Sequence, residues 1–191
     1  MKRAIFFILM TIMQLSFAAE FASITKLKGK VTINGKIATI KFLIKDKDLI
    51  AVDKKSFIKL KATDNTMIIV GPNSQLKVDL SSKKIPVEII GGSLRWKSPG
   101  SKKVYLGVKS KNAVLGVRGT DFFVEKNNIF NETQMVCFSG EVLMINAKDR
   151  TDKKTVKSGQ WGGIGGRYSQ RIGEIIDLSP EIIKSFKDLL D

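Results

Sequence analysis

Short segments in which apolar and polar residues alternate recur along the chain, and they constrain its fold more than any other feature. Residues 58–62, 76–80 and 85–89 each place apolar side chains at every second position. Successive side chains of a β-strand point to opposite faces, so this period predicts strands with one face in a core and the other in water. Further strands are expected at residues 30–34, 67–70, 93–97, 103–109, 121–126, 133–138 and 141–146.

Turn-forming residues separate these segments, and their spacing indicates the fold class. The turns are expected at Asn34-Gly35, Gly71-Pro72-Asn73, Gly91-Gly92, Pro99-Gly100 and Ser139-Gly140. Gly29, Gly92 and Gly140 each precede alternating apolar positions, a weak internal echo that favours a solenoid. The predicted fold class is all-β, a short solenoid-like or sandwich β domain with one C-terminal amphipathic helix.

That helix is expected over residues 179–190. Ser179 is a suitable N-cap, Pro180 fits the first helical position and Glu181 suits the positive end of the helix dipole. One apolar stripe follows, formed by Ile182, Ile183, Phe186, Leu189 and Leu190. The stripe is expected to pack on the β domain, with packing on a partner as the alternative. The preceding residues 161–178 are expected to be a glycine-rich linker or an edge strand.

The N-terminus has the pattern of a secretory signal peptide. Lys2 and Arg3 precede an apolar run over residues 4–17, and Ala18 ends a small-residue cleavage pattern. We therefore expect residues 1–18 to be removed and the protein to be exported, to the periplasm or beyond the cell. The only cysteine, Cys137, is remote from the cleavage site, so no lipid anchor is expected. After cleavage no integral membrane span is expected either.

Residue types that many enzymes require are missing from the chain. The sequence has no histidine and one cysteine, which excludes histidine-based triads and thiolate zinc clusters. Acidic residues are present but scattered, and no pair stands out as a catalytic dyad. The protein is therefore expected not to be an enzyme and to need no cofactor or metal.

Positive charge is concentrated in one region. The chain carries a net charge of +15, and residues 26–61 hold eleven lysines against three aspartates. The candidate polyanion-binding residues are Lys26, Lys28, Lys30, Lys54, Lys55, Lys59 and Lys61. Lysines outnumber arginines 27 to 6, which argues against nucleic acid as the polyanion. Lipopolysaccharide, acidic lipid or a cell-wall polymer fits an exported protein, and solvated strand faces are the alternative.

Residues 113–122, Ala-Val-Leu-Gly-Val-Arg-Gly-Thr-Asp-Phe, resemble the signature of the FecR-domain family, Val-Arg-Gly-Thr-x-Phe. Flanking segments resemble the family in order, so that the resemblance covers residues 24–160, with a core match over 45–146. It implies a compact solenoid-like β structure and a role in envelope binding or sensing. In the best-known members this domain belongs to a transmembrane regulator that senses an outer-membrane transporter and controls a sigma factor. This chain shows neither their cytoplasmic segment nor their spanning helix, so a direct sigma-regulator role is not expected.

The signature residues Gly116, Val117, Arg118, Gly119, Thr120 and Phe122 are expected to be structural. The glycines suit tight backbone geometry between two strands. Arg118 is expected to bind carbonyls or to pair with Asp121 or Glu141, and a ligand-facing arginine is the alternative. The leading hypothesis for function is a non-enzymatic envelope binding or sensing module that engages an envelope protein. The alternative is attachment to a lipopolysaccharide or wall polymer through the lysines.

Overall fold

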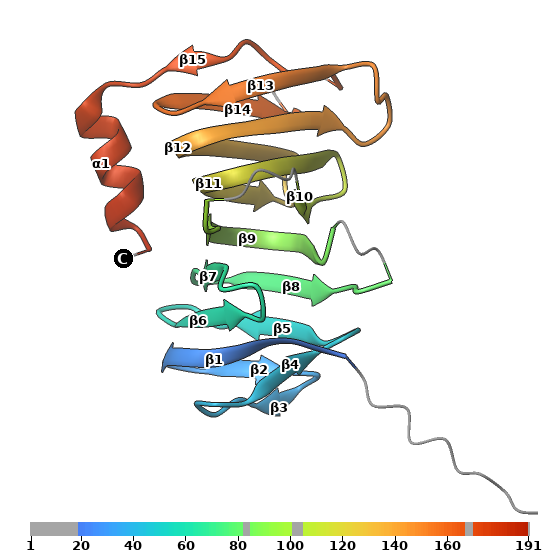
Figure 1. Cartoon of the computed structure of the whole chain (residues 1–191), viewed down its shortest axis with the longest axis vertical. Coiled ribbons are helices and arrows are strands. Elements are labelled where there is room, and N and C mark those ends of the chain that lie inside the picture. The colour runs from blue at the N-terminus through green and yellow to red at the C-terminus, as the bar shows by residue number, and fades with distance from the viewer. Residues whose placement is uncertain (1–18, 82–84, 101–104, 167–169, 191) are drawn as a thin grey trace, which may run out of the picture.

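The computed structural model describes residues 19–81, 85–100, 105–166 and 170–190, and the expected signal peptide lies outside them. The described chain is built from β-strands with one C-terminal helix, which confirms the predicted fold class (Figure 1). The first strands are β1 (Glu20–Lys28), β2 (Val31–Ile33), β3 (Lys36–Ile37), β4 (Leu43–Lys45), β5 (Leu49–Val52), β6 (Phe57–Ala62), β7 (Met67–Val70) and β8 (Ser74–Val78). The later elements are β9 (Val87–Lys97), β10 (Tyr105–Lys109), β11 (Ala113–Asn127), β12 (Glu132–Asn146), β13 (Lys153–Lys157), β14 (Gln160–Ile164), β15 (Ile176–Asp177) and α1 (Pro180–Asp188).

Backbone pairing divides the strands into two layers that share three long strands. Layer A contains β4, β1, β6, β7, the C-terminal halves of β9 and β11, the N-terminal half of β12, β14 and β15. Layer B contains β3, β2, β5, β8, the N-terminal halves of β9 and β11, β10, the C-terminal half of β12, and β13. The main core lies between the layers and includes Phe122, Ile50 and Met135.

Glycines bend the chain where it passes from one layer to the other. Gly92 lies inside β9 with φ +83°, and a Cβ there would lie 2.3 Å from the Ser74 hydroxyl oxygen. The next residue, Ser93, donates its N–H to that oxygen at 2.9 Å. Gly29 has the same arrangement, because the Lys30 N–H binds the Ser56 hydroxyl at 2.9 Å. At Gly29 and Gly92 the echo in the sequence is therefore a repeated corner, in which only glycine leaves room for the serine.

The predicted turns at Gly91-Gly92 and Ser139-Gly140 are wrong. Strands β9 and β12 run continuously through these positions and change layer there. Gly119 makes the corresponding corner in β11, where φ is +58° and the Thr120 N–H binds the Ser98 hydroxyl at 3.0 Å. A glycine followed by alternating residues is compatible with a turn or with a bend inside one strand, so the local pattern does not separate the two.

A second apolar cluster lies on the outer face of layer A, beneath α1. Its strand residues are Ile69, Phe123, Val136, Phe138 and Trp161. The helix begins as predicted, because the Ser179 side chain accepts a hydrogen bond from the Ile182 N–H and Pro180 occupies the first turn. None of the helices in the described residues is both long and apolar enough to cross a membrane.

Candidate functional site

One row of outward-facing side chains crosses layer A from β14 to β1. Consecutive members are paired in the strand register: Trp161, Val136, Phe123, Arg95, Ile69, Lys59 and Lys26. Their sequence neighbours, such as Phe122, Leu94 and Ile68, point into the main core instead. The row is apolar at one end and cationic at the other. The outer face of layer A therefore changes from apolar near β14 to positively charged near β1.

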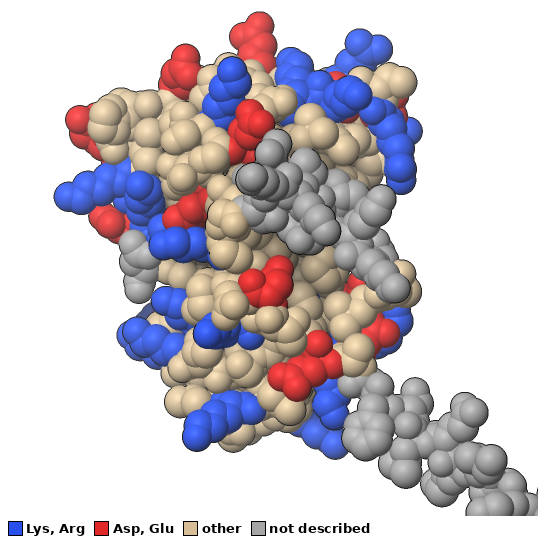
Figure 2. Space-filling view, viewed as in Figure 1, with Lys and Arg blue, Asp and Glu red and all other residues tan. Residues whose placement is uncertain are grey.

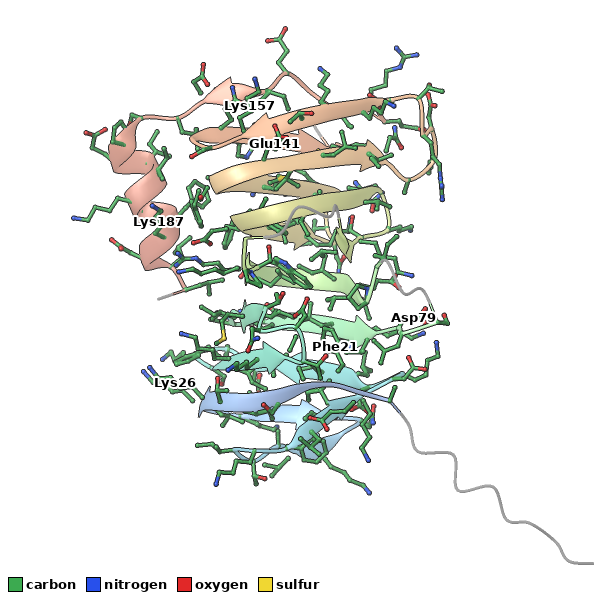
Figure 3. All side chains as sticks on the ribbon, viewed as in Figure 1. Phe21, Lys26, Asp79, Glu141, Lys157 and Lys187 are labelled. Atoms are coloured by element: carbon green, nitrogen blue, oxygen red, sulfur yellow. The ribbon has the colours of Figure 1, made fainter. Side chains whose placement is uncertain are left out.

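Helix α1 covers the apolar half of this row. Phe186 lies against Phe123 with ring centroids 5.4 Å apart, and Ile183 packs on the same cluster. The Lys187 ammonium lies 5.6 Å from the centre of the Phe138 ring. Figure 3 shows Lys187 and Lys26 on the same side of the molecule, with the helix beside the upper strands only. The lower half of the face, on β6 and β1, is left open by the described residues.

A groove of about 350 Å³ lies where the helix ends and the open half begins. It is lined by Lys28, Lys55, Ser56, Phe57, Ile69, Pro72, Leu189 and Leu190. Leu190 is buried, but Leu189 is 62% exposed at the groove. The groove therefore joins an apolar floor to a cationic rim, and its volume is in the range of small ligand sites.

Arg95 and Asp121 form a buried ion pair within the covered half of the face. The guanidinium also lies 5.1 Å from the centre of the Phe138 ring. Both oxygens of Asp121 accept hydrogen bonds from Arg95, at 2.9 and 3.0 Å. Asp121 was also an expected partner of Arg118. The side chain of Arg118 lies outside the part of the chain that the structure describes. Its backbone pairs opposite Glu141 in the β11–β12 register.

The signature residues lie at a corner and in the core. Val117 and Phe122 are buried between the layers, while Gly119 forms the bend of β11. Thr120 is 1% exposed, and its hydroxyl is without a hydrogen-bond partner among the described residues. Gly116 is buried beside them. None of these five signature residues lines the groove.

The candidate lysines divide into two groups. Lys26, Lys59 and Lys61 project from the outer face of layer A, and Lys28 and Lys55 stand at the groove rim. Figure 2 shows basic side chains gathered at the lower left of the view, over the strands near the N-terminus. Lys26 also lies 5.3 Å from the centre of the Phe57 ring.

The other candidates, Lys30 and Lys54, lie at the corner between the layers. The Lys30 ammonium is 3.7 Å from Asp53, and the Lys54 N–H binds the Asp53 carboxylate at 3.0 Å. The seven lysines were predicted as one group because they are close together along the chain. In the structure Lys30 and Lys54 lie at the corner, away from the lysines on the outer face of layer A. Phe57, Ile69 and Leu189 were missed as groove residues, although Phe57 shares the strand parity of Lys59 and Lys61.

The described residues hold no cluster of three or more carboxylate, thiol or imidazole groups suited to a metal ion. Burial raises the pKa of the Cys137 thiol to about 11, so it is a poor nucleophile at neutral pH. The outer face of layer A combines the groove with a group of exposed lysines. The fold is an all-β module with one C-terminal helix.

The model of the family described as FecR protein matches residues 48–143, just over half of the chain. The protein belongs to the FecR family. Its fold is similar to two crystal structures of a "putative anti-sigma factor" from Parabacteroides distasonis ATCC 8503, each with TM-score 0.58 and 14% sequence identity. The similarity covers 73% of this chain and 64% or 63% of the Parabacteroides chain, so this chain spans less than two thirds of that protein. No curated protein matches the sequence.

Proposed function

We propose that this protein is a non-catalytic sensing module of the cell envelope and binds a protein partner in the groove beside α1. Membership of the FecR family and the likeness to an anti-sigma factor fold support a role in signalling. The signal-peptide pattern supports export to the envelope. The observation that carries the proposal is the half-covered face: one helix already docks on the apolar half of the row, and the groove opens beside Ile69 of that row, at the end of the helix.

The lining of the groove indicates what kind of segment it accepts. Phe57 and Ile69 give an apolar floor that fits an apolar anchor side chain. Lys28 and Lys55 at the rim favour a partner with acidic residues next to that anchor. An amphipathic helix that lays an apolar stripe into a groove is a recurrent mode of recognition, and α1 uses this mode within the chain. The partner segment is therefore amphipathic and acidic.

Site-specific photo-crosslinking tests the proposal. A photoreactive residue is placed at position 189, at the groove, or at position 176, where Ile176 is 51% exposed outside it. Both proteins are expressed in their native envelope. A partner that binds in the groove is crosslinked from position 189 and not from position 176.

Charge-reversal variants complete the test. Lys28→Glu with Lys55→Glu is expected to abolish the crosslink from position 189, whereas Lys153→Glu with Lys157→Glu, on β13, is expected to leave it unchanged. Equal crosslinking from positions 176 and 189, or a crosslink that survives the groove charge reversal, contradicts the proposal. The melting temperature of each variant shows that the fold is retained.

A second candidate function is attachment to an anionic envelope polymer. Its support is that Lys26, Lys59 and Lys61 project from one open face, without an ion pair in the described part of the chain. Such binding should weaken steeply as salt rises, because exposed charges are screened. Replacing these three lysines by Gln should abolish retention on immobilised lipopolysaccharide or wall polymer. Retention that neither salt nor these substitutions reduce contradicts it.

A further inference from the structure

The segment of residues 36–45 closes the N-terminal end of the stack, and we call it the end cap. It begins as β3 at the edge of layer B, crosses the end of the main core, and returns as β4 at the edge of layer A. Figure 1 shows it at the lower end of the molecule, farthest from β13 and β15. Neither the groove nor the helix-covered half of layer A includes these residues.

The backbone of the end cap is fixed to the strands beneath it. The Ala38 N–H binds the Val31 carbonyl at 2.9 Å, and the Lys41 N–H binds the Ile24 carbonyl at 3.0 Å. Two of its side chains, Ala38 and Ile44, are buried in the main core. The side chains that point away from the core are therefore held in place by an ordered segment.

Four of those outward side chains are large and apolar. The exposed fractions are 75% for Ile37, 58% for Ile40, 40% for Phe42 and 42% for Leu43. Single exposed apolar residues are ordinary on protein surfaces, but four within seven consecutive residues form a patch. A patch of this kind indicates a surface that is covered in use.

Most of the charges beside the patch are positive, and Glu20, opposite Lys45 in the β1–β4 register, is the acidic exception among its paired residues. Lys36, Lys41 and Lys45 are exposed and alternate with the apolar residues, and no acidic residue occurs from residue 26 to residue 45. The carboxylates that follow are engaged in local structure. Asp46 accepts the Leu80 N–H at 2.7 Å, and Asp48 accepts the Lys45 N–H at 2.8 Å.

The short strands, the apolar side chains and the lysines of the end cap together indicate what kind of partner covers it. Addition of a partner strand is disfavoured because β3 and β4 are two and three residues long and carry Lys36 and Lys45 at their ends. Pairing of two end caps is disfavoured because it brings two cationic surfaces together. An anionic bilayer surface satisfies both components, since apolar side chains enter the headgroup boundary while lysines contact the anionic headgroups.

We infer that the end cap is a docking surface for an anionic lipid bilayer, with Ile40 and Phe42 entering the interface and Lys36, Lys41 and Lys45 binding headgroups. This inference is independent of the groove, which lies at the end of α1. A protein docked in this way presents the open face of layer A and its groove beside the membrane rather than toward it.

Co-sedimentation with vesicles tests the inference on the chain from Ala19 onward, which contains all the strands and the helix described. Vesicles of phosphatidylethanolamine with phosphatidylglycerol are compared with vesicles of phosphatidylcholine alone. The protein is expected to bind the first and not the second. Ile40→Ser with Phe42→Ser is expected to weaken binding about tenfold or more, because two apolar side chains no longer enter the interface.

A matched control is offered by the β11–β12 hairpin, where Ile129 is 88% and Phe130 is 63% exposed. Ile129→Ser with Phe130→Ser removes a similar apolar surface elsewhere and should leave vesicle binding unchanged. Replacing Lys36, Lys41 and Lys45 by Gln should abolish the preference for phosphatidylglycerol. Binding that is equal on both vesicle types, or insensitive to Ile40→Ser with Phe42→Ser, overturns the inference.

A fluorescent reporter distinguishes lipid from other occupants. Cys137 is buried, so a cysteine introduced by Ile40→Cys can be labelled selectively with an environment-sensitive dye. Its emission should rise on addition of the anionic vesicles, while the same dye at an Ile129→Cys site should not respond. A rise that depends on protein concentration without vesicles would instead identify self-association and overturn the inference.

Discussion

Arg95 and Asp121 join β9 to β11 through two parallel hydrogen bonds, from Nε to Oδ1 at 2.9 Å and from Nη2 to Oδ2 at 3.0 Å. The side chains are only 10% and 14% exposed, and Arg95 lies between Phe123 and Ile69 in the row on the outer face of layer A. A charged pair so placed is stabilising only while both members are present, because a single buried charge is costly.

Asp121→Ala should therefore destabilise the protein by about 3 kcal/mol, because it leaves the Arg95 guanidinium buried without this carboxylate. The double variant Arg95→Met with Asp121→Leu should lose less than Asp121→Ala alone, since no charge is then buried. Urea unfolding of the two variants measures the difference. A double variant less stable than Asp121→Ala would contradict this account of the pair.

Gly92→Ala should cost more than about 2 kcal/mol of unfolding free energy, because a methyl group there meets Ser74 at the corner of β9. Gly35→Ala is the matched control. Gly35 also has a positive φ, +78°, but no atom lies within 4 Å of the position that an added methyl group would take, so only backbone strain of about 1 kcal/mol is expected. Similar losses for the two variants, measured by thermal unfolding, would show that the Ser74 contact is unimportant.

The Cys137 thiol should make stability fall in alkaline solution. Burial raises its pKa from 9.0 to about 11, so between these values the unfolded chain loses a proton that the folded chain keeps. The unfolded state then binds fewer protons, and the free energy of unfolding falls by roughly 2–3 kcal/mol as pH rises from 9 to 11. Cys137→Ala should lack this component. Unfolding free energies of both proteins across this pH window test it, and parallel curves would contradict it.

Phe186→Ala should loosen the docking of α1 by about 1–2 kcal/mol, because Phe186 contacts Phe123 on the covered face. Ile182→Ala is the control on the same helix, since Ile182 is 45% exposed. Hydrogen exchange of the α1 amides should accelerate in the first variant and change little in the second. Equal exchange rates of the α1 amides in the two variants would show that Phe186 does not hold the helix on the sheet.

The sequence predicted the class of fold because strand periodicity and helix capping are local properties. Residues 58–62 and 67–70 emerge as β6 and β7, and Ser179 caps α1. The continuous corners at Gly92 and Gly140 could not be predicted, since a glycine with positive φ serves a turn and a bend equally well.

The candidate site was less predictable because it depends on pairing between distant strands. The row from Trp161 to Lys26 exists only in the register of strands that are far apart in sequence. The lysine content of β1 and β6 was visible in the sequence, but the groove was not. Its walls come from β1, β6, β7 and the end of α1, which no local pattern brings together.

Three strands belong to both layers, and this has a mechanical consequence. Because β9, β11 and β12 pass from one layer to the other as unbroken chain, no plane separates the layers without rupturing covalent backbone. A pull on layer A is therefore transmitted into layer B through covalent backbone and not through side-chain packing alone.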